Sequence, residues 1–245
     1  MKTVFSATSA ARATSATVTI PLWGRMSDLY GRKRLFQAAI VVFLAGSALS
    51  GAAQSIGELI AFRALQGLGA GGLMTLAMAI VADIISPRER GRYQGYIQMV
   101  FVVASVAGPL LGGLFADHLS WRWVFYVNIP IGVVALTVVS TTLARTTTDR
   151  RPRIDWLGAA LLAAAITSAL LVTTWGGREY AWDSVAIVGL AAAAVAMLGA
   201  FVVQERRAPE PILPLRLFRD PVFDVVSAVL FLTTCLLYTS DAAAN

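Results

Sequence analysis

Long, mostly apolar segments alternate with short polar segments along this 245-residue chain. A helix needs about 20 apolar residues to cross about 30 Å of hydrocarbon, and several segments meet that requirement. They lie at 35–53, 59–82, 93–116, 123–144, 156–177, 185–203 and 221–238. The pattern predicts an all-α membrane protein, a helical bundle of about six to eight transmembrane helices.

The two ends of the chain fit this pattern less well. Residues 1–23 are rich in Ser, Thr and Ala and include Lys2 and Arg12, a poor composition for a transmembrane segment. Two interpretations stay open for them, a genuine but weak span and an altered or truncated start. Residues 239–245 look like the end of an incomplete reading frame. We therefore expect a chain that is incomplete at both ends.

The basic residues gather on alternate sides of the predicted spans. If the segment 24–34 faces the cytoplasm, the turns at 86–92, 145–153 and 204–220 do so too. These four segments hold 15 Lys and Arg residues, against 2 in the outer turns. Lys and Arg collect on the cytoplasmic side of membranes, so we expect a multi-pass protein of the inner (plasma) membrane with cytoplasmic basic loops. Aromatic residues typical of the membrane interface flank two outer turns: Trp121, Trp123, Tyr126, Trp175, Tyr180 and Trp182.

Composition agrees and excludes other classes of protein. The chain is 57% hydrophobic and 14% charged, with a mean hydropathy of +0.70, so its solvent is mostly lipid. The net charge of +6 comes from basic residues in short turns and not along one face, which argues against nucleic-acid binding. The single cysteine, Cys235, excludes an internal disulfide. His118, the sole histidine, lies in an outer turn without a nucleophile or ligand set, so we expect no enzyme, cofactor or metal site. No obligate protein partner is evident.

The first candidate functional pattern is the basic segment 24–34. Gly24 and Gly31 flank a predicted tight turn, and Asp28 lies four residues before Arg32, with Lys33 next to it. Glycines let helices approach closely, while Asp28 can pair with Arg32, with another basic group or with a helix N-terminus. The alternative is an ordinary basic cytoplasmic turn, which would need neither Asp28 nor the glycines.

The second pattern places a charge inside an apolar segment. Arg63 lies about one turn from the outer end of its predicted helix, and Gln66 and Gly67 fall on the same face. A charge inside a membrane costs about 2.5 kcal/mol or more and usually faces a bundle interior or a water-filled cavity. The alternative is that Arg63 extends to the outer headgroups. Gly67 with Gly71 predicts a surface for close helix contact.

The third pattern is a stripe of small residues around a proline. Ala104, Gly108 and Gly112 recur every fourth residue, Gly113 follows, and Pro109 removes one helical hydrogen bond. A bent, closely packed helix can act as a hinge or seal between two conformations. A static tight crossing would produce the same pattern.

In this order, the segments resemble the major facilitator superfamily, whose loop between the second and third helices follows G-x-x-x-D-x-x-G-R-[KR]. Gly24, Asp28, Gly31, Arg32 and Lys33 match that motif. Arg63, Gln66 and Gly67 resemble the family's motif in the fourth helix. The antiporter motif of the fifth helix is matched by Gly108, Pro109, Gly112 and Gly113, and Ala104 stands where the family often has glycine. The segments 121–132 and 155–158 are similar to the drug:proton antiporter branch with fourteen spans.

The resemblance implies a proton-coupled transporter that exports small, often amphipathic compounds by alternating access. Arg63 and Gln66 would belong to the proton-coupling region, the segment 24–33 would gate the cytoplasmic side, and the stripe 104–113 would form the hinge. Residues 1–153 would be a partial N-terminal half, 154–204 two linking helices, and 205–245 a cytoplasmic loop with the start of the C-terminal half. The partners would be a small-molecule substrate, protons and the lipid bilayer.

A transporter needs both halves to enclose its site, so we expect this chain to be an inactive portion of an exporter. The alternative is a membrane protein that senses a ligand or regulates a partner without transporting anything.

Overall fold

The computed structural model describes residues 2–143, 155–177, 179–208 and 220–243, and within them it contains helices and no strand. The helices follow in chain order: α1 (Lys2–Tyr30), α2 (Arg32–Ala52), α3 (Ile56–Ile84), α4 (Arg90–His118), α5 (Trp123–Tyr126), α6 (Asn128–Thr142), α7 (Trp156–Trp175), α8 (Val185–Arg207) and α9 (Pro221–Ala243). The predicted all-α membrane fold is confirmed.

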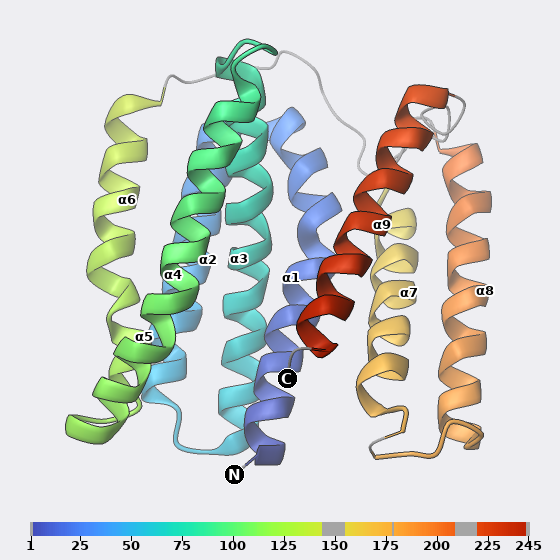
Figure 1. Ribbon diagram of the computed structural model, residues 1–245, viewed down its shortest axis with the longest axis horizontal. Coiled ribbons are helices and arrows are strands. Elements are labelled where there is room, and N and C mark those ends of the chain that lie inside the picture. The colour runs from blue at the N-terminus through green and yellow to red at the C-terminus, as the bar shows by residue number, and fades with distance from the viewer. Residues whose placement is uncertain (1, 144–154, 178, 209–219, 244–245) are drawn as a thin grey trace.

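Six segments of the described chain are long and apolar enough to cross a membrane. They are α2, α3, α4, α5 together with α6, α7 and α8, and they coincide with the first six predicted spans. The seventh prediction falls on α9, whose described apolar part is shorter. Figure 1 shows these helices running up and down side by side, as expected for a multi-pass membrane protein.

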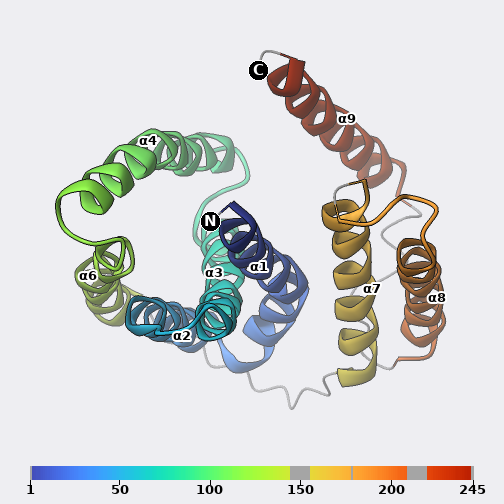
Figure 2. The same cartoon turned by 90° about the horizontal axis from the view of Figure 1, so that it is seen from below.

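The centre of the bundle is formed by α1, α2 and α3 (Figure 2). A small core of Leu35, Ala39 and Leu76 is completed by partly buried neighbours that include Trp23 of α1. The indole nitrogen of Trp23 donates a hydrogen bond of 2.8 Å to the Leu68 carbonyl oxygen of α3. Residues 2–23 thus belong to a helix that packs against α3 and α2.

The hydroxyl groups of α1 explain how so polar a segment forms a helix there. Ser15 donates a hydrogen bond to the Ala11 carbonyl oxygen at 2.8 Å, and Thr19 donates one to the Ser15 carbonyl oxygen at 2.8 Å. These two hydroxyl donors are satisfied within their own helix, and small side chains let α3 come close. α1 is nevertheless not one of the six apolar candidate spans.

Glycines on two faces of α3 set its distance from both neighbours. A methyl group on Gly67 or Gly71 would overlap backbone carbonyl oxygens of α1, and one on Gly69 would overlap the backbone of α2. The close contact surface predicted for Gly67 and Gly71 is therefore confirmed, with α1 as its partner.

The predicted turn at 24–34 is much shorter than expected. α1 continues to Tyr30 and α2 begins at Arg32, so Gly31 alone separates them. Its φ of 87° lies in a region that residues with a Cβ rarely adopt, which explains why one glycine can end a helix. Gly24 and Asp28 belong to α1, and Arg32 and Lys33 open α2.

The predicted span 123–144 is interrupted near its start. α5 ends at Tyr126 and α6 begins at Asn128. Pro130 lacks the N–H that would bond to the Tyr126 carbonyl, and its ring would clash with that group, so the regular helix breaks there.

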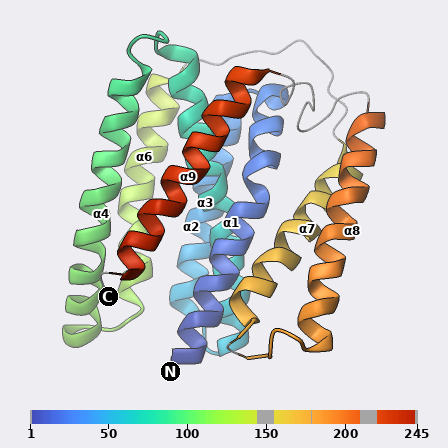
Figure 3. The ribbon, with the colours of Figure 1, turned by 45° about the vertical axis from the view of Figure 1, so that its right-hand side comes forward.

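The helices α7 and α8 form a pair beside the bundle, and α7 also contacts α1 (Figure 3). The side-chain amide nitrogen of Gln204 donates to both carboxylate oxygens of Asp155 at 3.2 Å, which joins the end of α8 to the start of α7. The predicted basic turn 145–153, and most of that at 204–220, lie outside the described residues.

Candidate functional site

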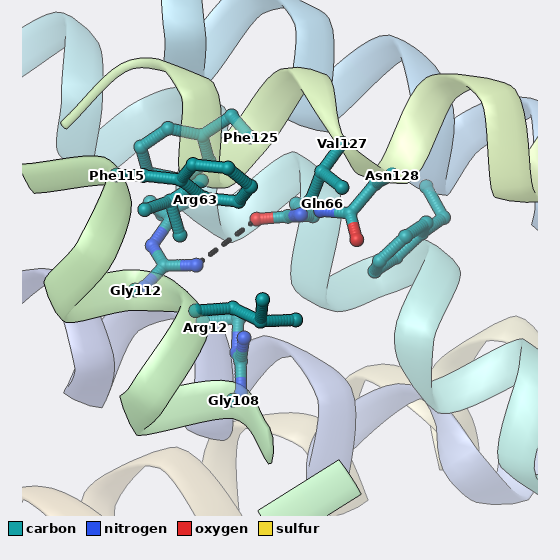
Figure 4. A pocket seen from close by; sticks show the side chains of 12 residues that line it. Arg12, Arg63, Gln66, Gly108, Gly112, Phe115, Phe125, Val127 and Asn128 are labelled. Atoms are coloured by element: carbon teal, nitrogen blue, oxygen red, sulfur yellow. Dashed lines mark hydrogen bonds between the residues drawn. The ribbon is translucent and has the colours of Figure 1, made fainter. Parts of the chain in front are cut away.

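A cavity of about 310 Å³ opens among α1, α3, α4 and the α5–α6 segment. We call it the Arg63 cavity. Figure 4 shows the side chains that line it, which come from helices far apart in the sequence: Arg12, Arg63, Gln66, Gly108, Gly112, Phe115, Phe125 and Asn128 among others. Two separately predicted sets, Arg63 with Gln66 and the stripe on α4, therefore meet at one space.

Arg63 lies near the start of α3, half-buried in the cavity wall. Its guanidinium donates a hydrogen bond of 3.1 Å to the side-chain oxygen of Gln66, one helical turn further along. The guanidinium carbon also lies 5.1 Å from the centre of the Phe125 ring, which places the cation over an aromatic face. Of the two positions open to Arg63, the structure shows the one inside the bundle.

Gln66 is held from its other end by a buried serine. Gln66 is 1% exposed and Ser47 of α2 is 0% exposed. The Gln66 amide nitrogen donates to the Ser47 hydroxyl oxygen at 3.1 Å, and the Asn128 amide nitrogen donates to the same oxygen at 3.0 Å. The Ser47 hydroxyl in turn donates to the Phe125 carbonyl oxygen at 2.9 Å. Ser47 thus links α2, α3, α5 and α6 and fixes the orientation of the amide that faces Arg63.

The stripe on α4 faces open space. Gly108 and Gly112 line the cavity, and a methyl group added to Gly108, Gly112 or Gly113 would meet no atom within 4 Å. Ala104 is exposed, and Pro109 lies inside α4, which continues through it. In the described part of the chain no helix packs against this stripe, so its predicted role in a hinge or tight crossing stays a prediction.

The basic end of the bundle is organised around the start of α2. Arg32 forms an ion pair with Asp83, in the last turn of α3, with 2.6 Å between nitrogen and oxygen, and it also donates to the Ala79 carbonyl oxygen. The Lys33 ammonium donates to the carbonyl oxygens of Ser140 at 2.7 Å and Leu143 at 2.5 Å, at the end of α6. Both cations therefore bind the negative ends of neighbouring helices. The Asp28 side chain lies outside the described residues, so its predicted pairing stays a prediction.

At the opposite end of the bundle, Arg122 likewise binds the C-terminus of a helix. It donates to the carbonyl oxygens of Gly51 at 3.1 Å and Ala53 at 3.0 Å, at the C-terminus of α2. Its guanidinium also lies 5.3 Å from the centre of a Trp121 ring system. The sequence showed Arg122 only as one of two basic residues in the outer turns.

Sequence reasoning missed four residues that the structure brings into these sites. In the sequence, Arg12 served only as evidence that residues 1–23 make a poor transmembrane segment, yet it lines the Arg63 cavity. Asp83 and Asn128 are polar residues at or inside apolar segments, a signal that could have marked them. Ser47 gave no signal, because a serine in an apolar helix usually bonds to its own backbone.

A second cavity, of about 510 Å³, lies between α1, α3 and α7. Its lining is apolar with a few hydroxyl groups and holds no charged side chain. Within the described residues, no three His, Cys, Asp or Glu side chains gather as they would around a metal ion.

The family model of the Major Facilitator Superfamily matches residues 2–243. The chain belongs to the Major Facilitator Superfamily. This confirms the resemblance drawn from the sequence motifs, and the expectation that the chain is not an enzyme agrees with a family of transporters.

Curated relatives of this superfamily chain are named as transporters. An uncharacterised MFS-type transporter of Mycobacterium tuberculosis is 45% identical over 215 residues, which cover 88% of this chain and 31% of the relative. Multidrug resistance protein 3 of Bacillus subtilis is 40% identical over 213 residues, covering 87% and 42%. An efflux pump of Gibberella moniliformis is 38% identical over 234 residues, covering 91% and 41%. The chain thus spans 31–42% of the length of these relatives.

Proposed function

We propose that this chain is part of a proton-coupled secondary transporter that exports small amphipathic compounds by alternating access. Membership of the superfamily and the names of the relatives support the general function. The observation that carries the proposal is the half-buried Arg63, which lies at a cavity inside a membrane bundle and is oriented by buried hydrogen bonds.

In this proposal Arg63 supplies a fixed charge for proton coupling, and Gln66 holds it in place. Arginine stays protonated, so it does not carry the transported proton itself. A positive charge in a membrane interior favours the ionised form of an acid that comes near it, so a substrate that changes the surroundings of Arg63 would change proton binding. The acid would lie outside the described lining, because none of the described residues that line the cavity is Asp or Glu. Substrate and proton movements would be linked in this way.

We assign gating to the basic end of the bundle and bending to α4. Arg32 and Lys33 hold the start of α2 against the ends of α3 and α6, and releasing these contacts would let the helices separate. The proposed gating segment also includes Gly24, Asp28 and Gly31, which precede them in the chain. Bending would occur in the hinge stripe of α4, where Pro109 already lacks one backbone hydrogen bond. The hinge stripe comprises Ala104, Gly108, Pro109, Gly112 and Gly113.

The proposed domain plan and orientation follow from the same arrangement. Residues 1–153 would form a partial N-terminal half, 154–204 two linking helices, and 205–245 a loop with the start of the C-terminal half. The separate pairing of α7 with α8 supports this division. The α1–α2 junction, the α3–α4 turn and the end of α6 lie at one edge of the bundle in Figure 1, which supports a common cytoplasmic side in the inner membrane.

The test is efflux from whole cells. The gene that encodes this chain, read in both directions to its natural start and stop, is expressed in bacteria that lack their own exporters. Cells loaded with a fluorescent amphipathic dye should lose it faster than control cells, and a protonophore should abolish the difference. Arg63→Ala should remove export, whereas Arg92→Gln, an exposed arginine on α4 outside the cavity, should not.

Export that persists with Arg63→Ala would contradict the coupling role. A protein that reaches the membrane, binds the dye and never moves it would favour the alternative of a ligand sensor or regulator.

A further inference from the structure

The short segment 121–128 lies against the helices that carry Arg63. Arg122, Phe125 and Asn128 follow one another at intervals of three residues, which places them on one face of a helical segment. Arg122 bonds to the C-terminus of α2, the Phe125 carbonyl oxygen accepts from Ser47 of α2, and the Asn128 amide donates to Ser47. This face therefore docks on α2 directly beside the site.

The hydrogen bonds that start at Arg63 can run in one direction only. A guanidinium has only donors, so Gln66 must present its side-chain oxygen to Arg63. The Gln66 amide nitrogen then donates to the Ser47 hydroxyl oxygen, and the Ser47 proton goes to the Phe125 carbonyl oxygen, which can only accept. The chain of bonds thus leads from the cation to the backbone of α5.

Phe125 closes this chain into a loop. Its carbonyl oxygen accepts from Ser47, while its ring centre lies 5.1 Å from the guanidinium carbon of Arg63. A hydroxyl has one donor and two acceptor sites, and with Phe125, Gln66 and Asn128 as partners all three sites of Ser47 are used. A polar network in which every group is satisfied is rigid, so the place of α5 determines the place of the charge.

The contacts are complete within this part of the protein. Ser47 is 0% exposed and Gln66 is 1% exposed, with α2, α3, α5 and α6 around them. Further segments of the whole protein would pack around these contacts and would not replace them. The network therefore does not depend on whether the Arg63 cavity is open or filled.

We propose that Ser47 and Asn128 are positioning residues for proton coupling, which act on Arg63 through Gln66. This rests on the proposed function, in which Arg63 supplies the fixed charge. Without an acceptor at position 47, the Gln66 amide is free to turn its NH₂ group toward Arg63, where it repels the cation. The segment 121–128 would then no longer transmit the position of α5 and α6 to the charge.

The first test measures the orientation of Arg63 without transport. The natural gene product is purified in detergent with isotopically labelled arginine, and the Arg63 guanidinium signal in the NMR spectrum is identified by its loss in Arg63→Lys. Exchange of its protons with water should be about fivefold faster in Ser47→Ala, the factor that corresponds to one net hydrogen bond. Asn128→Ala should raise the rate by less. The Arg122 guanidinium, bonded to α2, is the internal control and should not change.

The second test separates coupling from folding in inside-out membrane vesicles. Dye transport driven by a pH gradient is compared with dye exchange in the absence of a gradient, which needs folded protein but no net proton movement. Ser47→Ala and Asn128→Ala should lower driven transport about fivefold relative to exchange. Ser47→Thr keeps the hydroxyl and should recover part of this ratio.

Two controls should keep the ratio of the parent protein. Ser50→Ala and Thr137→Val each remove a hydroxyl that donates to a carbonyl oxygen of its own helix. If Ser47→Ala does not fold, Asn128→Ala decides, because Asn128 is only half-buried.

Equal losses of driven transport and exchange in Ser47→Ala and Asn128→Ala would show a purely structural role and overturn the proposal. So would unchanged proton exchange at Arg63 in both variants. Faster Arg63 exchange in a product that moves no dye would refute the proposed function and leave the positioning of Arg63 standing. Gradient-driven dye export with an unchanged ratio in both variants would refute the positioning role alone.

Discussion

Arg32 and Asp83, 51 positions apart in the sequence, form an ion pair of 2.6 Å that joins the start of α2 to the end of α3. The Arg32 side chain is 24% exposed and that of Asp83 is 51% exposed. Because both side chains are partly exposed, water screens their attraction, and the ion pair contributes less to stability than its short N–O distance implies. Its importance would lie in orientation, because it holds two helices at the basic end of the bundle.

We predict that Arg32→Gln and Asp83→Asn weaken the same contact. A double-mutant cycle on thermal unfolding in detergent should give a coupling energy of about 0.2–1 kcal/mol, the range of exposed pairs. Asp117→Asn, an exposed acid that forms no ion pair among the described residues, is the matched control and should leave stability unchanged. Strictly additive effects of the two substitutions would contradict the pairing.

A second prediction concerns the close approach of α1 and α3. Gly67→Ala should destabilise the protein by about 1–3 kcal/mol, because its methyl group would overlap a backbone carbonyl of α1 that has little freedom to move. Gly57→Ala, in the same helix, meets no atom within 4 Å and should be neutral or slightly stabilising. Thermal unfolding in detergent compares the two. Equal melting temperatures for both variants would show that the helices are not in contact at Gly67.

The third prediction concerns Ser47. Ser47→Ala removes three hydrogen bonds and leaves amides of Gln66 and Asn128 without that acceptor, at a cost of about 1–3 kcal/mol. Ser50→Ala is the control in the same helix, since buried Ser50 donates only to the Gly46 carbonyl oxygen of its own helix. Ser50→Ala should cost clearly less in the same unfolding assay. A network with no energetic role would make the two variants indistinguishable.

The fourth prediction concerns the outer end of α2. Arg122→Lys should loosen this end, because an ammonium group lacks the planar fork that reaches two carbonyl oxygens and stacks on Trp121. Hydrogen exchange of the backbone amides around 50–56 should become faster. In Arg92→Lys, where the arginine bonds to and stacks on Tyr96 of its own helix, exchange at these amides should stay at the unmodified rate.

The spanning helices could be predicted because their signal is local. Residues 156–177 predict a span from composition and length alone, and α7 covers nearly the same range. The turn at 24–34 was wrong in extent, since polar residues such as Asp28 look like a turn whether or not the helix continues. Only the φ of Gly31 shows where the chain breaks, and no hydropathy pattern reports a backbone angle.

From the sequence, site residues could be identified within single helices, but the contacts between helices could not. Arg63 was identified because a charge in an apolar segment is costly wherever the helix packs. Ser47 was not, because its composition signal is weak and its importance comes from three partners on other helices. Arg12 was counted against a membrane span and became a cavity residue only once α1 was packed against α3.

By itself, the sequence determined the membrane class, the approximate positions of six apolar spans, and the individual residues whose chemistry is out of place in lipid. These properties depend on transfer of each segment from water to hydrocarbon, which composition alone sets. Only the tertiary structure decided that Arg32 pairs with Asp83, that Ser47 joins four helices and that two arginines share one cavity. Such contacts depend on the angles and distances at which helices pack, and those are set by side chains far apart in the chain.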